Sequence, residues 1–353
     1  MAQIDRMLHL MKAANASDLH LKAGMRPRYR VLGELRDVEG SPVLTREEVD
    51  KLTRELLSEE QDRFYREIGE IDFAYGDVKS GRFRCNFFME HWGPAAVFRR
   101  IPVEIPSLKD LQLPPALETL IHLRGGIVLV TGPTGSGKTS TLASLLDLIN
   151  AQYRKHIITL EDPIEYIIRS RNCHVSQREV FTHTESFATA LRAALREDPD
   201  VIMVGEMRDL ETISLAITAA ETGHLVLATL HTSNASRTLD RLLDVFPPEQ
   251  QEHVRVMVAE SLRGVISHQL IPKKDGTGRV LALEILTNTP AVANVIREAK
   301  TYMLPGIIQT GKKQGMRLMD DALIDLYDRG LISAEEAFER AEEKRIVGQH
   351  VNK

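Results

Sequence analysis

The glycine-rich segment at residues 132–139 constrains the fold of this chain more than any other part of its sequence. It reads Gly-Pro-Thr-Gly-Ser-Gly-Lys-Thr, and it separates a β-branched apolar run at residues 127–130 from a helix-like stretch at residues 139–150. A strand, a glycine turn and a helix in this order direct several backbone amides and the positive end of the helix toward one place. We therefore expect an α/β fold built on parallel strands.

The residue types in this segment predict a phosphate-binding P-loop. Its glycines let the backbone wrap around phosphate groups, the ammonium group of Lys138 adds positive charge, and the hydroxyl of Thr139 is placed to ligate Mg²⁺ directly. The residues predicted to bind nucleotide are Gly132, Pro133, Thr134, Gly135, Ser136, Gly137, Lys138, Thr139 and Ser140. Because a polyphosphate satisfies all these groups together, we predict ATP and Mg²⁺ as cofactors.

Short apolar runs alternate with helix-like stretches beyond Gly125. The predicted buried parallel strands are residues 127–130, 156–160, 201–204 and 225–230. The predicted helices between them are residues 139–150, 185–197 and 210–222. This alternation predicts an α/β nucleotide-binding domain over residues 116–353, which we expect to become mostly helical from about residue 272.

The first hundred residues have another pattern and predict a small α+β domain. Strand-like runs occur at residues 29–32, 71–75 and 82–88, with a helix-like stretch at residues 45–60. Four prolines between residues 101 and 115 interrupt any regular element. We therefore place a domain at residues 1–100 and a proline-rich linker at residues 101–115.

The composition excludes several classes of protein. Lys and Arg total 45 against 50 Asp and Glu, and no dense basic stretch is present, so we expect no nucleic-acid partner. Cys85 and Cys173 are far apart in sequence, which argues against a disulfide or zinc framework and fits a reducing cytosol. No apolar run approaches the roughly 20 residues of a membrane span, so we expect a cytoplasmic protein without direct membrane insertion.

Hydrolysis of a bound nucleotide requires a group that activates water, and Glu206 is the leading candidate. It follows the predicted strand at residues 201–204, and ligands of α/β sheets bind at the carboxyl ends of the strands. Gly205 stands where many P-loop enzymes carry a metal-binding Asp, so another carboxylate has to serve the metal. Glu161 and Asp162 are placed to hold a metal-bound water, with Glu165 in the same turn. A solvated acidic turn is the alternative for Glu161 and Glu165.

Two histidines flank the predicted strand at residues 225–230. His231 follows it and His224 precedes it. A histidine at a strand end can sense the γ-phosphate through a hydrogen bond. Because single histidines are often structural, that alternative stays open for both.

Charge on the transferred phosphoryl group also needs cations from outside the loop. The predicted N-terminal domain offers Arg82, Arg84, Arg99 and Arg100. Arg84 and Arg99 flank what look like neighbouring strands just before the linker. The alternative is that these arginines lie on the surface at sheet edges.

Four further motifs, in order along the chain, resemble those of the secretion ATPase superfamily. Residues 159–165 (Thr-Leu-Glu-Asp-Pro-Ile-Glu) resemble its Asp box, and residues 193–200 (Ala-Ala-Leu-Arg-Glu-Asp-Pro-Asp) are similarly characteristic. Residues 204–209 (Val-Gly-Glu-Met-Arg-Asp) resemble its atypical Walker B motif, and residues 223–235 resemble its His box. Within the superfamily, the whole chain is similar to the type IV pilus retraction ATPases of the twitching-motility PilT type.

The resemblance implies a homohexameric ring of RecA-like domains, each preceded by a PAS-like domain that packs against the neighbouring subunit's nucleotide. Glu206 would be the general base, and Glu161 would serve the magnesium ion through water. Arg84 and Arg99 match the family's N-terminal arginines, whereas Arg192 and Arg196 would lie near the subunit boundary.

The resemblance also implies partners. The ring would turn an inner-membrane platform protein and thereby withdraw pilin subunits from the fibre. Retraction is favoured because the chain lacks the tetracysteine insert of extension ATPases, and because residues 291–298 keep most of a motif of the retraction group, with Ala293 in place of its first arginine. A pilus extension or type II secretion ATPase is the alternative, followed by a RecA-like nucleic-acid motor.

Overall fold

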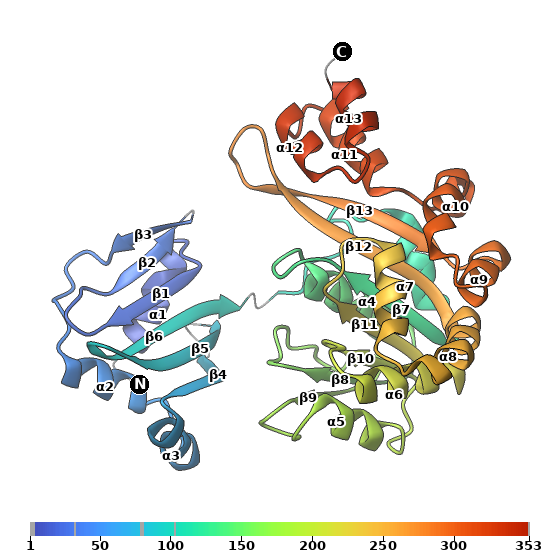
Figure 1. The fold of residues 1–353 in the computed structure, drawn as a ribbon. Helices are drawn as coiled ribbons and strands as arrows, with labels where there is room; N and C mark the ends of the chain where they lie inside the picture. The colour runs from blue at the N-terminus through green and yellow to red at the C-terminus, as the bar shows by residue number, and fades with distance from the viewer. Residues whose placement is uncertain (1–3, 32, 78–80, 102–103, 352–353) are drawn as a thin grey trace. The chain divides into compact units, whose positions relative to one another are not determined.

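The computed structural model describes residues 4–31, 33–77, 81–101 and 104–351, and Figure 1 shows the elements of the fold. The chain divides into two compact units. The first is Met1–Glu104 with Pro163–Ile167, and the second is Ile105–Asp162 with Ile168–Lys353. Leu32, at the end of one predicted strand, and residues 102–103 of the predicted linker lie outside the described residues.

The first unit is an antiparallel sheet with three helices. Its strands, in spatial order, are β3 (Glu34–Asp37), β2 (Arg28–Val31), β1 (Asp18–Lys22), β6 (Gly93–Ile101), β5 (Gly81–Glu90) and β4 (Glu70–Asp77). The helices are α1 (Asp5–Ala13), α2 (Arg46–Arg54) and α3 (Glu59–Ile68). Strand β5 explains how the sheet packs, because its buried Phe83, Cys85 and Phe87 alternate with less buried neighbours.

The prediction of a single helix-like stretch at residues 45–60 is wrong, because two separate helices, α2 and α3, begin in this segment. Each helix has its own capping box, with Thr45 and Glu48 at the start of α2 and Ser58 and Gln61 at the start of α3. A capping box satisfies orphan backbone amides at a helix start, so the second box begins a new helix.

The second unit is a mixed sheet covered by helices, as Figure 1 shows. Its strands, in spatial order, are β13 (Arg279–Thr287), β12 (Leu262–Pro272), β7 (Gly126–Thr131), β11 (Leu225–Leu230), β10 (Val201–Val204), β8 (His156–Glu161) and β9 (His174–Glu179). Only β13 is antiparallel to its neighbour. The α/β fold expected from the P-loop is confirmed.

Helices cover both faces of this sheet and continue beyond it. In chain order they are α4 (Lys138–Gln152), α5 (Phe187–Ala194), α6 (Leu210–Glu221), α7 (Ala235–Asp244), α8 (Pro248–Ser261), α9 (Pro290–Arg297), α10 (Leu304–Thr310), α11 (Met319–Asp328), α12 (Ala334–Arg340) and α13 (Lys344–Val351). Short 3₁₀ turns occur at Pro115–His122, Thr301–Met303 and Lys312–Gln314.

Strand β7 anchors two separate cores because its side chains alternate between the faces of the sheet. Ile127 and Leu129 pack into the core that includes residues of α5, α6 and α8. Val128 and Val130 pack into the core that includes residues of α4. Burial on both faces is typical of parallel strands and fixes the strand that carries the P-loop.

The chain beyond residue 272 is mostly helical, as expected, except at residues 279–287, where β13 completes a hairpin with β12. Strand β9 was also not predicted; it reads His-Val-Ser-Gln-Arg-Glu and is an edge strand of the sheet. An edge strand is paired on one side only, so it needs no continuous apolar run.

Gly126 offers a test of how tightly β7 is held. Its φ is +113°, and a Cβ there would lie 2.5 Å from the Ser261 carbonyl oxygen. We predict that Gly126→Ala lowers the free energy of unfolding by about 3 kcal/mol through strain and overlap. Gly306→Ala is the matched control, because a Cβ at Gly306 in α10 meets no atom within 4 Å. Equal urea midpoints for both variants would contradict this packing.

Candidate functional site

Four predicted site segments converge where the central parallel strands of the second sheet end, at their carboxyl ends. Strands β7, β11, β10 and β8 are neighbours and run parallel, so their carboxyl ends lie together. The P-loop follows β7, His231 follows β11, Glu206 lies two residues after β10, and Glu161 ends β8. The fold thus brings together groups that are up to about a hundred residues apart in sequence.

The P-loop has the features of a phosphate cradle. Lys138 Nζ donates to the carbonyl oxygens of Gly132 at 2.8 Å and Pro133 at 3.0 Å, which holds the ammonium group against the loop. Gly137 precedes α4 with a φ of +92°, and no side chain caps the helix. An uncapped helix start with a lysine beside it fits a bound polyphosphate.

Glu206 is held by two neighbouring side chains. One carboxylate oxygen accepts a hydrogen bond from Arg208 at 2.6 Å, and the other lies 3.0 Å from His231 Nε2. Burial alone would raise the pKa of Glu206, but Arg208, His231 and the charge of Lys138 outweigh it and lower that pKa. Glu206 is therefore a carboxylate at neutral pH.

His231 is neutral under the same conditions. Burial and the positive charges of Lys138 and Arg208 lower its pKa, despite the opposite effect of Glu206. A neutral imidazole can still donate one N–H, so the contact with Glu206 places that proton on Nε2.

Glu161 is buried beside the Walker B segment. Its Oε1 atom accepts hydrogen bonds from the Thr159 hydroxyl at 2.6 Å and the Gln177 amide at 3.0 Å. Gly205 N donates to the Leu160 carbonyl at 2.7 Å, and a Cβ at Gly205 would lie 3.0 Å from that same oxygen. An Asp at position 205 would therefore crowd β8, which fits glycine there.

The donor set suits Mg²⁺ in part. Thr139 and Glu161 offer the hard oxygen ligands that this ion prefers. Among the described residues, no group of three or more His, Cys, Asp or Glu side chains is arranged to hold a metal ion. A magnesium site here would therefore need oxygens from phosphate groups and water.

Three predicted residues of the second unit do not lie at the carboxyl ends of these strands. His224 precedes β11 at the opposite end, where its Nδ1 lies 3.0 Å from the Ala219 carbonyl oxygen. Arg192 on α5 forms an ion pair with Glu211 on α6, and Arg196 follows α5. Glu165 belongs to Pro163–Ile167, which is part of the first unit.

The predicted arginines of the first unit lie on β5 and β6. Arg84 and Arg99 are directly paired across these strands. Arg84 contacts Asp72 at 2.6 Å and Arg99 contacts Asp18 at 2.8 Å. Arg82 lies on the same face of β5 as Arg84, whereas Arg100 follows Arg99 on the opposite face of β6.

Sequence reasoning missed four side chains that contact the site residues. Arg208 lies two positions after Glu206 within the motif already recognised, so its charge was a usable signal. Thr159 and Gln177 bind Glu161, and His268 on β12 contacts the P-loop backbone. The contacts of Gln177 with Glu161 and of His268 with Ser136 join separate segments of the chain, which only the fold brings together.

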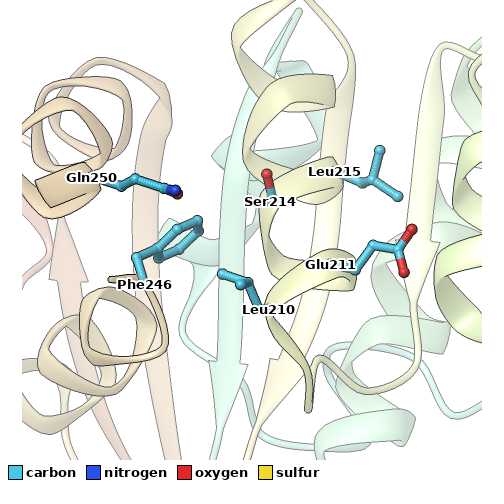
Figure 2. Close-up of a pocket in the computed structure, with 6 residues that line it drawn as sticks. All are labelled: Leu210, Glu211, Ser214, Leu215, Phe246 and Gln250. Atoms are coloured by element: carbon cyan, nitrogen blue, oxygen red, sulfur yellow. The ribbon is translucent and has the colours of Figure 1, made fainter. Parts of the chain in front are cut away.

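A pocket of about 410 Å³ lies elsewhere in the second unit. Figure 2 shows Phe246 facing Leu210 across it, with Gln250 and Ser214 nearby. It contains none of the predicted site residues.

In the described part of the chain, no helix is long and apolar enough to cross a membrane.

Known proteins share this fold and sequence. A family model described as "Type II/IV secretion system protein" matches residues 2–345. The type IV pilus retractation ATPase PilT of Pseudomonas aeruginosa is 48% identical over 338 residues, covering 96% of this chain and 98% of that protein. A twitching motility protein of Neisseria gonorrhoeae is 48% identical over 316 residues, covering 90% and 84%.

A solved structure agrees with these sequence matches. The crystal structure of the pilus retraction motor PilT and bound ADP has a TM-score of 0.91 and 45% identity, covering 97% of this chain and 99% of that one. The resemblance predicted from the motifs is confirmed by these matches.

Arg208 provides a test of the electrostatics at Glu206. Replacing it with glutamine removes the hydrogen bond and the charge that stabilise the carboxylate, so we predict that the pKa of Glu206 rises. The pKa is measured by NMR titration of glutamate labelled at the carboxyl carbon, with Glu206→Gln identifying the signal. Arg171→Gln, which removes an ion pair with Asp147, is the control and should leave that pKa unchanged. An unaltered Glu206 titration in Arg208→Gln would contradict this account.

Proposed function

Because the chain belongs to the type II/IV secretion system protein family, we propose that it is an ATPase motor that drives type IV pilus retraction and twitching motility. The observation that carries this proposal is the convergence of the P-loop, Glu161, Glu206 and His231 at one sheet edge. The near full-length identity to retraction ATPases supports the biological role.

Glu206 acts as the general base that activates the attacking water. Its lowered pKa keeps it ionised, and the carboxyl end of β10 positions it beside the loop that binds the phosphates. Arg208 binds one oxygen of this carboxylate and His231 the other. His231 thus links the base to the end of the next strand, where it can respond to the γ-phosphate.

The P-loop binds and orients ATP. Lys138 and the amides at the start of α4 stabilise negative charge on the phosphates. Mg²⁺, when bound, would neutralise charge on the phosphate oxygens; Thr139 would ligate it directly and Glu161 would hold a water on it. Thr159 and Gln177 orient Glu161 by donating hydrogen bonds to its Oε1 atom.

Arg84 and Arg99 complete the site from a neighbouring subunit of a homohexamer. They are paired across β5 and β6, and their side chains are 43% and 69% exposed. Two adjacent exposed guanidinium groups suit contact with a phosphoryl group of another chain. Arg192 and Arg196 would lie near the subunit boundary.

The motor works in the cytoplasm and reaches the inner membrane through the pilus machinery. Its direct partner is the inner-membrane platform protein of the pilus, and pilin subunits are moved indirectly. The proposal includes neither a nucleic-acid partner nor insertion into the membrane.

Glu206→Gln tests the chemistry. The amide cannot accept a proton, so we predict that kcat falls at least about a hundredfold while ADP affinity changes little. Turnover is measured by phosphate release and affinity by calorimetry. Glu249→Gln, on the exposed start of α8, is the matched control and should keep normal turnover.

The same variant tests the biology. A strain whose only copy carries Glu206→Gln should show excess surface pili and no twitching. Unchanged turnover in the purified variant would refute the role of Glu206, whereas bald cells would refute retraction and indicate extension.

A further inference from the structure

His268 lies beside the P-loop, outside every motif that the sequence analysis used. Strand β12 runs parallel to β7 and pairs Ser267 with Thr131, so the next residue, His268, lies beside the start of the loop. Its side chain is fully buried, and its Nδ1 atom lies 3.3 Å from the Ser136 carbonyl oxygen. A titratable side chain on β12 thus contacts the backbone of the P-loop.

The backbone of His268 also contacts the loop. A Cβ at Gly132 would lie 2.6 Å from the His268 carbonyl oxygen, and one at Gly137 would lie 3.9 Å from its Nδ1 atom. The first and sixth residues of the loop therefore both pack on this one residue. A change at position 268 would act on the loop directly.

The contact with Ser136 fixes the direction of an amide. The Ser136 carbonyl and the Gly137 N–H belong to one planar trans peptide, so they point in opposite directions. A donor that holds the carbonyl toward β12 turns the amide away from β12, toward the side where the uncapped start of α4 receives phosphate.

We propose that His268 is a positioning residue of the P-loop, donating from Nδ1–H to the Ser136 carbonyl and thereby aiming the Gly137 amide at the nucleotide phosphates. This inference rests on the proposed nucleotide binding at the loop. It adds a residue from β12, which lies outside the family motifs.

The protonation state of His268 agrees with this role. Burial lowers its pKa to about 4, despite the hydrogen bond to Ser136, and the charge of Lys138 acts in the same direction. The ring is therefore neutral and carries one proton, which the carbonyl contact places on Nδ1. Its buried Nε2 atom has no hydrogen-bond partner among the described residues.

That unpartnered Nε2 argues against a side chain that only fills space. A buried acceptor without a partner destabilises the fold, whereas a leucine would avoid this cost. A leucine, however, could not donate a hydrogen bond to the Ser136 carbonyl as Nδ1–H does. An asparagine could donate this hydrogen bond, because its side-chain nitrogen is as many bonds from the backbone as Nδ1.

ADP affinity of the purified full-length protein tests the proposal. We expect His268→Leu to weaken ADP binding about tenfold and His268→Asn to remain within about threefold of the wild type, with kcat at saturating ATP nearly unchanged in both. Ser267→Ala is the matched control, because it removes the buried 2.9 Å hydrogen bond between Thr131 and Ser267 on the same strand. It should lower the thermal midpoint without changing ADP affinity.

Unchanged ADP affinity in His268→Leu would overturn the proposal, as would equal weakening in the Leu and Asn variants. If the Leu variant does not fold, His268→Gln replaces it. The glutamine amide nitrogen lies one bond further from the backbone than that of asparagine, so His268→Gln should bind ADP more weakly than His268→Asn. Wild-type protein that binds ADP without hydrolysing ATP would refute the proposed function but not the role of His268.

Discussion

The parallel alignment of β7, β11, β10 and β8 is the constraint on which the site depends. The carboxyl ends of these four strands lie together. A different site residue or segment lies at or just after the end of each strand. Burial on both faces holds β7 in place. Gly126 lets β7 pass close to the Ser261 carbonyl, and Gly205 lets the chain after β10 pass close to the Leu160 carbonyl of β8. The geometry of the site is thus set by packing within the sheet.

Electrostatics then determine how the assembled groups behave. Burial opposes ionisation of Glu206, but the hydrogen bond and charge of Arg208 and the charge of Lys138 keep it ionised. The same positive charges and burial keep His231 neutral. One cluster therefore presents an ionised carboxylate beside an uncharged imidazole, and a phosphate group entering the loop would change the balance of charge on both.

The sequence predicted the parts of the structure that follow local rules. The four central strands and the P-loop were predictable because apolar runs and glycine spacing report burial and turns directly. The pairing of β12 with β13 and the edge strand β9 were not, since their weak patterns acquire meaning only beside a partner strand. Thr159 lies two positions before the predicted Glu161, but His268 and Gln177 are brought to the site by tertiary contacts alone.

The central claim is that each nucleotide site is shared between two subunits, one supplying Glu206 and its neighbour supplying Arg84. Mixed rings test it most directly. Arg84→Gln chains and Glu206→Gln chains, each poorly active alone, are co-expressed with different tags and purified through both. One boundary in four then combines both native residues, so ATP turnover should recover to about a quarter of the wild-type rate. Turnover no higher than the average of the two separate variants would contradict a shared site.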